Sequence, residues 1–170
     1  VIEGKPGEKG TKLKILLVAV PKETIAQYQE IARAANLEIA SLEAEVFALK
    51  RALIPKGDER LICLIDIGAQ TTSCSIIENG ILKASHTFET SGNQMTQILS
   101  SSLEIEWLKS EKIKKKYGLT KKVEKRVGEI LYPLVDLILA EIKKMTQEGF
   151  KTPDLYLLCG GTALMPGFRE

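Results

Sequence analysis

Residues 61–72, which read LICLIDIGAQTT, decide the fold. The first seven of them form a nearly continuous apolar run, which is typical of a strand buried on both faces. Asp66 is the one charged residue in that run, and Gly68-Ala69-Gln70 follows it as a turn. We therefore predict a buried strand that ends near Asp66 and passes through a tight turn into the next strand.

The next strand is expected at residues 71–78 and a third at 81–89, joined by Asn79-Gly80. Asn-Gly is the strongest short hairpin signal, because both of its residues accept the positive φ that a type I′ turn requires. Apolar residues at three- and four-residue spacing then predict further helices, and an apolar pentapeptide before Gly160 predicts a last strand. These helices are expected at 94–102, 104–117 and 122–147, and the strand at 155–159.

Upstream, the sequence has the strand, helix, strand pattern of an α/β layer. An apolar run at 14–20 predicts a strand, Pro21 opens a helix, and 37–40 predicts another short strand. A second helix is expected at 43–53, whereas residues 1–12 have no periodicity and read as a flexible connector. The predicted fold class is α/β with a mixed sheet, preceded by a partial βαβ subdomain.

Composition narrows the class of protein. The 170 residues carry a net charge of +2 and are 44% hydrophobic, enough for a real core rather than a disordered tail. No apolar run approaches the ~20 residues of a membrane-spanning helix, and no signal peptide is expected. The first residue is Val1 rather than Met, which suggests a fragment or a processed chain.

The three cysteines indicate a reducing compartment. They are odd in number, widely spaced and placed in β-type apolar runs, so we interpret them as small buried hydrophobic residues. A single histidine and the absence of Cys-x-x-Cys argue against a zinc site.

The first candidate site is the turn after the buried strand. Its backbone N–H groups could cradle phosphate oxygens, Gly68 permits close approach, and Thr71 and Thr72 add hydroxyl donors. Asp66 could hold Mg²⁺ through water, because this ion gives up its hydration shell reluctantly. Taken alone, Asp-x-Gly also fits an ordinary turn.

The second candidate is Gly160-Gly161-Thr162, where a strand meets the expected start of a helix, an arrangement that suits anions. An ordinary strand-to-helix turn explains it equally. The third is Glu106-x-x-Lys109, whose helical spacing puts a carboxylate and an ammonium on one face. A surface ion pair is the alternative there.

A basic run lies between Lys109 and Arg126, with nine Lys or Arg and two Glu. It could contact phosphates or an anionic membrane, but a solvated helical face gives the same pattern.

The order of these motifs resembles the second lobe of an actin-like ATPase, a ribonuclease H-like fold, in the branch that contains FtsA and PilM. The stretches that carry the resemblance are ILLVAVPKETIAQYQEIARAANLEIASLEAEVFALKRAL, LICLIDIGAQTTSCSIIENGIL and LYLLCGGTALMPGF. It implies three parts: a connector at 1–12, a remnant of the inserted first-lobe subdomain at 13–41, and the second lobe at 42–170. Residues 93–120 would form the small upper subdomain.

The resemblance also implies roles for single residues. The turn after the buried strand is similar to the second phosphate motif, and GGTALMPG is similar to the adenosine motif. Glu106 and Lys109 would approach the ribose and base, and Glu43 would lie near metal-bound water. The implied nucleotide-binding residues are Asp66, Gly68, Gln70, Thr71, Thr72, Glu106, Lys109, Gly160, Gly161 and Thr162, with ATP and Mg²⁺ as cofactors.

A type IV pilus scaffold is the first functional reading, with ATP and Mg²⁺ as a conformational and assembly switch and little or no ATPase activity. It would be cytoplasmic, peripheral to the inner membrane and attached to it only indirectly. Its implied partners are the N-terminal cytoplasmic peptide of a PilN-like protein and other inner-membrane platform proteins, and self-association is left open. The family's first phosphate motif and most of the first lobe are absent, so this chain is expected to bind ATP weakly and to be inactive.

Two other readings stand beside it. An FtsA-like cell-division protein shares the same motifs. A basic nucleic-acid-binding module would use 109–126, but only Trp107 and Tyr117 flank that run, so no stacking platform is expected and no nucleic acid is predicted as a partner.

Overall fold

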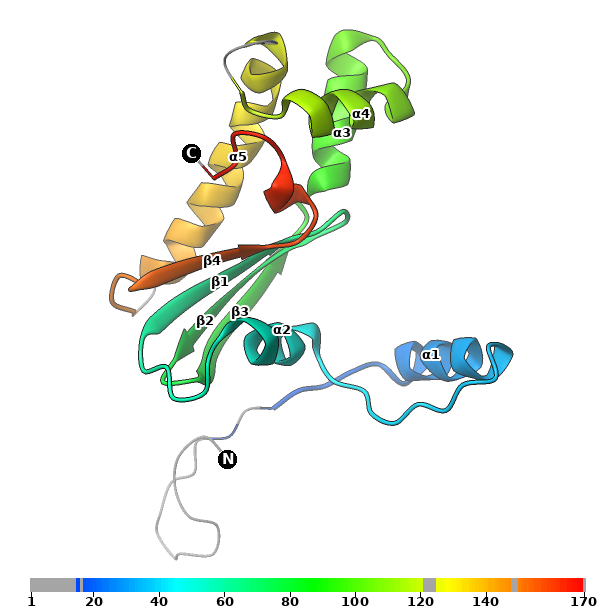
Figure 1. Ribbon diagram of the computed structural model, residues 1–170, viewed down its shortest axis with the longest axis vertical. Helices are drawn as coiled ribbons and strands as arrows, with labels where there is room; N and C mark the ends of the chain where they lie inside the picture. The colour runs from blue at the N-terminus through cyan, green and yellow to red at the C-terminus, as the bar shows by residue number, and fades with distance from the viewer. Residues whose placement is uncertain (1–14, 16, 121–124, 148–149, 170) are drawn as a thin grey trace, which may run out of the picture. The chain divides into compact units, whose positions relative to one another are not determined.

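The computed structural model describes residues 15, 17–120, 125–147 and 150–169, and the chain divides into two compact units, Val1–Pro55 and Lys56–Glu170 (Figure 1). Each unit is described by itself below. The predicted connector at 1–12 lies outside the described residues. The predicted division at residue 42 into a first-lobe remnant and a second lobe stays a prediction.

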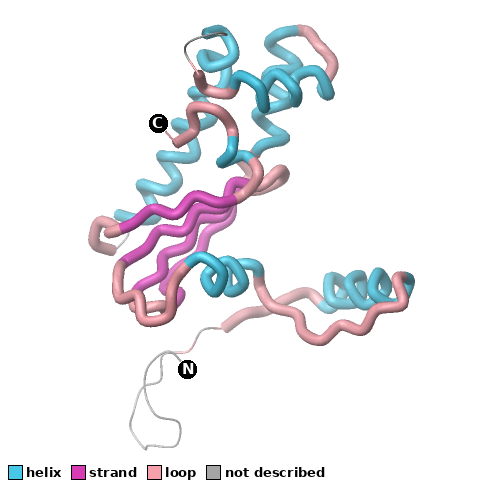
Figure 2. Tube along the Cα trace, viewed as in Figure 1, coloured by secondary structure: helices cyan, strands magenta, loops and turns pink. Residues whose placement is uncertain are grey.

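The second unit is built on a four-stranded mixed sheet (Figure 2). Its strands are β1 (Leu61–Ile67), β2 (Thr72–Glu78), β3 (Ile81–Phe88) and β4 (Leu155–Cys159), in the order β3-β2-β1-β4. The first three are antiparallel in series, as predicted, and β4 lies parallel to β1. Because β4 is parallel to β1, the carboxyl ends of both strands lie at one edge of the sheet.

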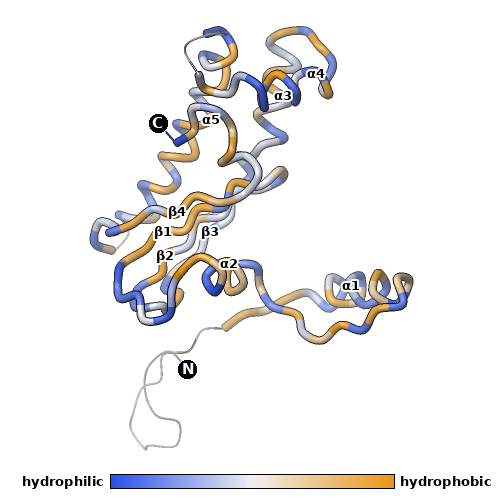
Figure 3. Tube along the Cα trace, viewed as in Figure 1, coloured by the Kyte–Doolittle hydropathy of each residue, from blue (hydrophilic) through white to orange (hydrophobic). Residues whose placement is uncertain are grey.

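Strand β1 is central and apolar (Figure 3), and six of its seven residues are buried. Asn79 and Gly80 have φ of 51° and 69°, which confirms the predicted hairpin turn between β2 and β3. Cys63 and Cys74 are buried free thiols, whereas Cys159 is only partly buried. The interpretation of the cysteines as small core residues is therefore confirmed for the two in β1 and β2.

The described residues of this unit also form three α-helices: α3 (Gly92–Leu103), α4 (Trp107–Tyr117) and α5 (Lys125–Gln147). An apolar stripe on α5 joins side chains of β1, β2 and α3 in one hydrophobic core. The buried residues of α5 are Val127, Gly128, Leu131, Leu134, Ile138, Ile142 and Met145. Residues 122–124, where this helix was expected to begin, lie outside the described residues.

Across the described residues, none of the helices combines the length and apolar character needed to span a bilayer.

Helix α4 begins three residues later than predicted. Glu104, the residue that ends α3, has a left-handed φ of 54°, and the Ile105 amide donates to the Ser100 carbonyl oxygen at 3.2 Å. A residue with positive φ ends an α-helix. The chain therefore leaves α3 at Glu104 and starts a new helix at Trp107 instead of continuing.

The described residues of the first unit form two helices, α1 (Lys22–Ala34) and α2 (Glu45–Leu53), both close to their predicted bounds. Neither predicted strand forms: residues 15, 17–20 and 37–40 are irregular. A strand needs a neighbour for its backbone N–H and C=O groups, and neither segment has a strand beside it among the described residues. The prediction of a partial βαβ subdomain was therefore wrong in its strands and right in its helix.

Candidate functional site

The turn after β1 is tight and is closed by a hydrogen bond between two of its own residues. The Gly68 amide donates to the Thr71 carbonyl oxygen at 2.9 Å, and a Cβ on Gly68 would lie only 3.0 Å from that oxygen. Residues 69–71 of this turn are exposed. The turn therefore presents its backbone to solvent at the carboxyl end of β1.

The turn after β4 packs directly on the end of β1. Gly160 has φ of +88°, and a Cβ there would overlap the Asp66 carboxylate and the Ile67 carbonyl oxygen. The next residue, Gly161, has an ordinary helical conformation with open space where its Cβ would be. The first of the two glycines therefore serves the fold, and the second faces free space beside the same corner.

Thr162 ties the two turns together. It is buried, and its hydroxyl donates to the Gly68 carbonyl oxygen at 3.2 Å. Only a short 3-10 turn, Thr162–Leu164, follows β4. The helix expected there is only this 3-10 turn, so the chain after β4 adds no α-helix N-terminus of its own that would suit anions.

The N-terminus of α3 joins the same corner. The amides of Gly92 and Asn93 donate to the carbonyl oxygens of Gly68 and Ala69 at 3.0 and 2.8 Å. Gly92 is buried, and a Cβ on it would overlap the Thr162 hydroxyl. Its lack of a side chain allows three segments, far apart in the sequence, to meet at one point.

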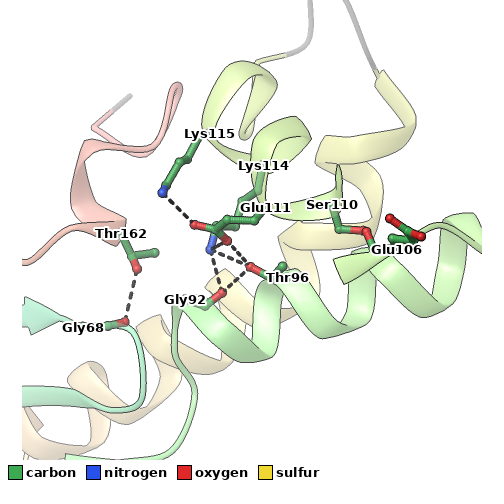
Figure 4. A network of polar contacts seen from close by, with 9 residues as sticks. All are labelled: Gly68, Gly92, Thr96, Glu106, Ser110, Glu111, Lys114, Lys115 and Thr162. Carbon is green, nitrogen blue, oxygen red and sulfur yellow. Dashed lines mark hydrogen bonds and ion pairs between the residues drawn. The ribbon is translucent and has the colours of Figure 1, made fainter. Parts of the chain in front are cut away.

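A polar network connects α4 to this point (Figure 4). The Lys114 ammonium donates to the Gly92 carbonyl oxygen and to the Thr96 hydroxyl, each at 2.7 Å, and forms an ion pair with Glu111 at 2.7 Å. The other oxygen of Glu111 pairs with Lys115 at 3.1 Å. The Lys114 side chain is 6% exposed and that of Lys115 is 74% exposed.

Glu111 is ionised in this environment. Burial opposes its negative charge, but the hydrogen bonds from Lys114, Thr96 and Lys115 outweigh that effect and lower its pKa to about 2. The network therefore holds a fixed carboxylate between two ammonium groups at physiological pH.

A pocket of about 360 Å³ opens where these elements meet. This volume lies at the lower end of the range of small-molecule sites. The turn after β1, the starts of α3 and of the 3-10 turn, and the middle of α4 contribute its lining. The lining residues are Ala69, Asn93, Glu111, Lys114, Lys115, Gly161, Thr162, Leu164 and Met165.

The structure brings together most of the predicted phosphate and adenosine residues. Gly161 and Thr162 line the pocket, and Asp66, Gly68 and Gly160 form the corner behind it. Gln70 and Thr71 are exposed on the adjoining turn.

Thr72 is placed differently, because it is fully buried and its hydroxyl donates to the Thr90 carbonyl oxygen at 2.6 Å. Its hydroxyl is committed to the fold, and Thr72 is not among the pocket lining.

Glu106 and Lys109 lie away from the pocket. Glu106 precedes the first residue of α4, both residues are exposed, and neither belongs to the lining. Their predicted contact with ribose and base stays a prediction. The residues that do line the pocket, Glu111 and Lys114, have the same Glu-x-x-Lys spacing five residues later. That second match was the sequence signal that could have found them.

Glu43 belongs to the first unit, where it is exposed and accepts hydrogen bonds from both terminal nitrogens of Arg51. The hydrogen bond with Arg51, which outweighs the opposing desolvation, lowers the pKa of the Glu43 carboxyl. Its predicted place near metal-bound water stays a prediction.

Known proteins share both the sequence pattern and the fold of this chain. The family model described as type IV pilus assembly protein PilM matches residues 2–170. The chain belongs to the PilM family. Among solved structures, a PilM-PilN type IV pilus biogenesis complex superposes with a TM-score of 0.73 and 23% identity, over 86% of this chain and 43% of that one.

Other relatives of this PilM-family chain are actin-like. MreB5 of Spiroplasma citri bound to ADP superposes with a TM-score of 0.65 and 19% identity, over 86% of this chain and 56% of that one. Cell division protein FtsA of Pseudomonas aeruginosa is 24% identical over 193 aligned positions, covering 96% of this chain and 46% of FtsA. The fold is thus actin-like, and the chain spans less than half of that FtsA.

Proposed function

We propose that this chain is part of a nucleotide-binding scaffold of type IV pilus assembly in which ATP acts as a conformational and assembly switch. The observation that carries the proposal is the meeting of two glycine turns, 68–71 and 160–162, beside a pocket at which the Lys115 ammonium is exposed. Backbone turns and ammonium groups at one point suit the phosphates of a nucleotide. The actin-like MreB5 structure contains ADP, which supports the same ligand class here.

The lining suggests how the two ends of a nucleotide would be bound. Lys115 is exposed at the pocket and offers a positive charge to phosphate, and the exposed turn at 69–71 offers backbone. Glu111 is an ionised hydrogen-bond acceptor, which suits a ribose hydroxyl. Gly161 leaves room for a base or sugar.

Mg²⁺ fits this site as an ion bound mainly through water and phosphate. No group of three or more Asp, Glu, His or Cys lies close enough to bind a metal within the part of the chain that the structure describes. Asp66 is a partly buried carboxylate at the corner, and a single carboxylate with nucleotide phosphates is a common way to bind Mg²⁺. When bound, the ion would neutralise phosphate charge.

A switch suits this chain better than a fast ATPase. A general base must be within hydrogen-bond reach of the proton that it takes. The only carboxylate predicted for that role, Glu43, is engaged by Arg51. Any ATP hydrolysis would accordingly be slow.

The proposed partner is the N-terminal cytoplasmic peptide of a PilN-like protein, since a PilM-PilN complex shares this fold. The peptide would use residues 13–41 together with parts of the first lobe beyond this chain. Such a role would place the protein in the cytoplasm against the inner membrane, among other platform proteins and with self-association as an added form of assembly.

The FtsA-like role is the second candidate, because FtsA proteins match nearly the whole chain. The PilM family match over residues 2–170 favours the pilus role. The nucleic-acid module loses support, because Lys114 in the basic run is buried. DNA binding with a steep salt dependence would revive it.

The first test is Asp66→Ala in the full-length protein. We expect the fold to persist and Mg²⁺-dependent ATP binding to be lost, because the carboxylate at the corner is removed. Calorimetric titration with ATP, with and without Mg²⁺, measures this. Unchanged Mg²⁺ dependence would remove the metal role from Asp66.

The second test is Gly161→Val. The position has ordinary backbone angles and open space, so the thermal unfolding midpoint should change little. The added side chain would occupy the pocket and weaken ATP binding about tenfold or more. Gly160→Val is the structural contrast, since it should impair folding itself. Unaltered ATP affinity in Gly161→Val would contradict the adenosine assignment.

A further inference from the structure

Lys114 has no hydrogen-bonding capacity left for a ligand. An ammonium group has three N–H donors. In this chain they meet three acceptors at 2.7 Å each: the Gly92 carbonyl oxygen, the Thr96 hydroxyl and a Glu111 oxygen. A buried ammonium with all three donors committed is part of the framework rather than a free contact for a nucleotide.

The acceptors of Lys114 are the ones that fix the start of α3. The Thr96 hydroxyl lies 2.9 Å from the same Gly92 carbonyl oxygen, so the lysine closes a ring of contacts over the first turn of that helix. The amide of the same Gly92 donates to the Gly68 carbonyl oxygen. One residue of α3 therefore joins α4 on one side and the turn after β1 on the other.

Two consecutive backbone hydrogen bonds link the start of α3 to the turn after β1. Gly92 and Asn93 donate consecutively to Gly68 and Ala69, at 3.0 and 2.8 Å. Thr162 adds a third contact to the Gly68 carbonyl oxygen. The conformation of the turn at 68–71 therefore depends on where the start of α3 is held.

Lys115 supplies a natural contrast. It pairs with the same Glu111 carboxylate, lines the same pocket and lies next in the sequence. Its side chain is 74% exposed and pairs with Glu111 at 3.1 Å, and among the described residues it makes no contact with the start of α3. The two neighbouring lysines thus share a carboxylate but differ in what else they hold.

We infer that Lys114 is a positioning residue that fixes the turn at 68–71 through the start of α3, and that Lys115 is the lysine left for the ligand. The role given to Lys115 rests on the proposed nucleotide function, whereas the contacts through which Lys114 holds the turn exist without ligand. Through this chain of contacts, a displacement of α4 changes the phosphate side of the pocket.

The first experiment needs no nucleotide. Amide hydrogen exchange, followed residue by residue by NMR, compares the 170-residue chain with Lys114→Met and Lys115→Met. Lys114→Met should speed exchange of the Gly92 and Asn93 amides about tenfold or more relative to the amides of the β1–β2 ladder. Without Lys114, the start of α3 can separate from the turn while the sheet stays folded. Lys115→Met should leave these two amides unchanged.

Two results would overturn the inference. One is that Gly92 and Asn93 speed up only in step with the β1–β2 ladder, which signals a global loss of stability. The other is that Lys115→Met has the same local effect as Lys114→Met. If Lys114→Met does not fold, Glu111→Gln provides the test, because it keeps the lysine but weakens its anchor. A smaller increase at the same two amides is then expected, and no local increase would contradict the inference.

The second experiment compares ATP with adenosine by NMR titration. Loss of Lys114 should weaken ATP binding about tenfold and adenosine binding clearly less, because the turn at 68–71 is disturbed whereas Glu111 keeps its ion pair with Lys115. Equal weakening of both ligands would mean that Lys114 contacts ribose or base directly and would overturn the inference. If neither ligand binds the unaltered chain, the proposed function fails for this chain, and the exchange experiment still decides the role of Lys114.

Discussion

Helix α4 offers two versions of one motif, Glu106-x-x-Lys109 at its start and Glu111-x-x-Lys114 in its middle. The residues of the first pair are exposed and lie outside the pocket. Those of the second pair contact each other at 2.7 Å beside the glycine corner. Five residues turn a helix by about 140°, so two pairs at this offset face different surroundings. Spacing puts a pair on one face, but packing decides which face meets the site.

The largest expected effect is on stability. Lys114→Met should lower the free energy of unfolding by about 3 kcal/mol, because a partly buried carboxylate and a buried carbonyl lose their donor. Lys109→Met, the matched change in the first pair, should cost less than about 0.5 kcal/mol, since Lys109 is exposed. Urea denaturation of both variants measures the difference. Equal losses of stability in the two variants would contradict the claim that only the second pair stabilises the fold.

The next effect concerns pH. Because the pKa of Glu111 is lowered to about 2 in the folded state, its stabilisation is present above the unfolded value of 4.5 and is lost as pH falls towards 2. After allowance for partial exposure we expect about 2 kcal/mol.

Glu111→Gln should remove that part of the acid-induced loss, whereas Glu106→Gln should leave the pH profile unchanged. Urea midpoints between pH 5 and pH 2 provide the measurement. Asp58, whose pKa is also lowered to about 2 by its hydrogen bonds with Arg60, is present in both variants and cancels in the difference. Identical profiles for the two variants would show that Glu111 is not held as described.

The smallest effect is on ligand affinity. Glu111→Gln should weaken ATP binding about tenfold, or 1.4 kcal/mol, because the pocket loses its ionised acceptor. Glu106→Gln should have no effect on binding. NMR titration of both variants sharpens the assignment, and a loss confined to Glu106→Gln would restore the first pair as the ribose contact.

Much of the fold was predictable because its signals are local. The apolar run of β1 and the Asn79-Gly80 turn determine three neighbouring strands without reference to distant residues. The resemblance to actin-like ATPases also assigned Gly68 and Gly160 to one nucleotide site, and the close approach of Gly160 to Asp66 and Ile67 brings both glycines to one corner.

Other predictions failed where the local structure depends on features that the hydrophobic pattern does not record. The apolar segments at 15–20 and 37–40 have strand composition, but strands need neighbours, and neither segment has one among the described residues. Glu104 interrupts what periodicity presents as a helix, since a left-handed residue leaves no mark in a hydrophobic pattern. The role of Glu111 depends on Thr96, which contacts it from another helix, and on Lys114, whose ammonium is held by the Gly92 carbonyl oxygen of that helix. Spacing along one helix does not reveal either contact.

The central claim is that the turns at 68–71 and 160–162 form one nucleotide site. Titration of the isotope-labelled chain with ATP and Mg²⁺ at millimolar concentration, followed by amide NMR, tests it most directly. The account predicts that the signals of both turns shift along one binding curve, together with those of Glu111 and Lys115. Shifts confined to one turn, or two curves with different midpoints, would contradict it.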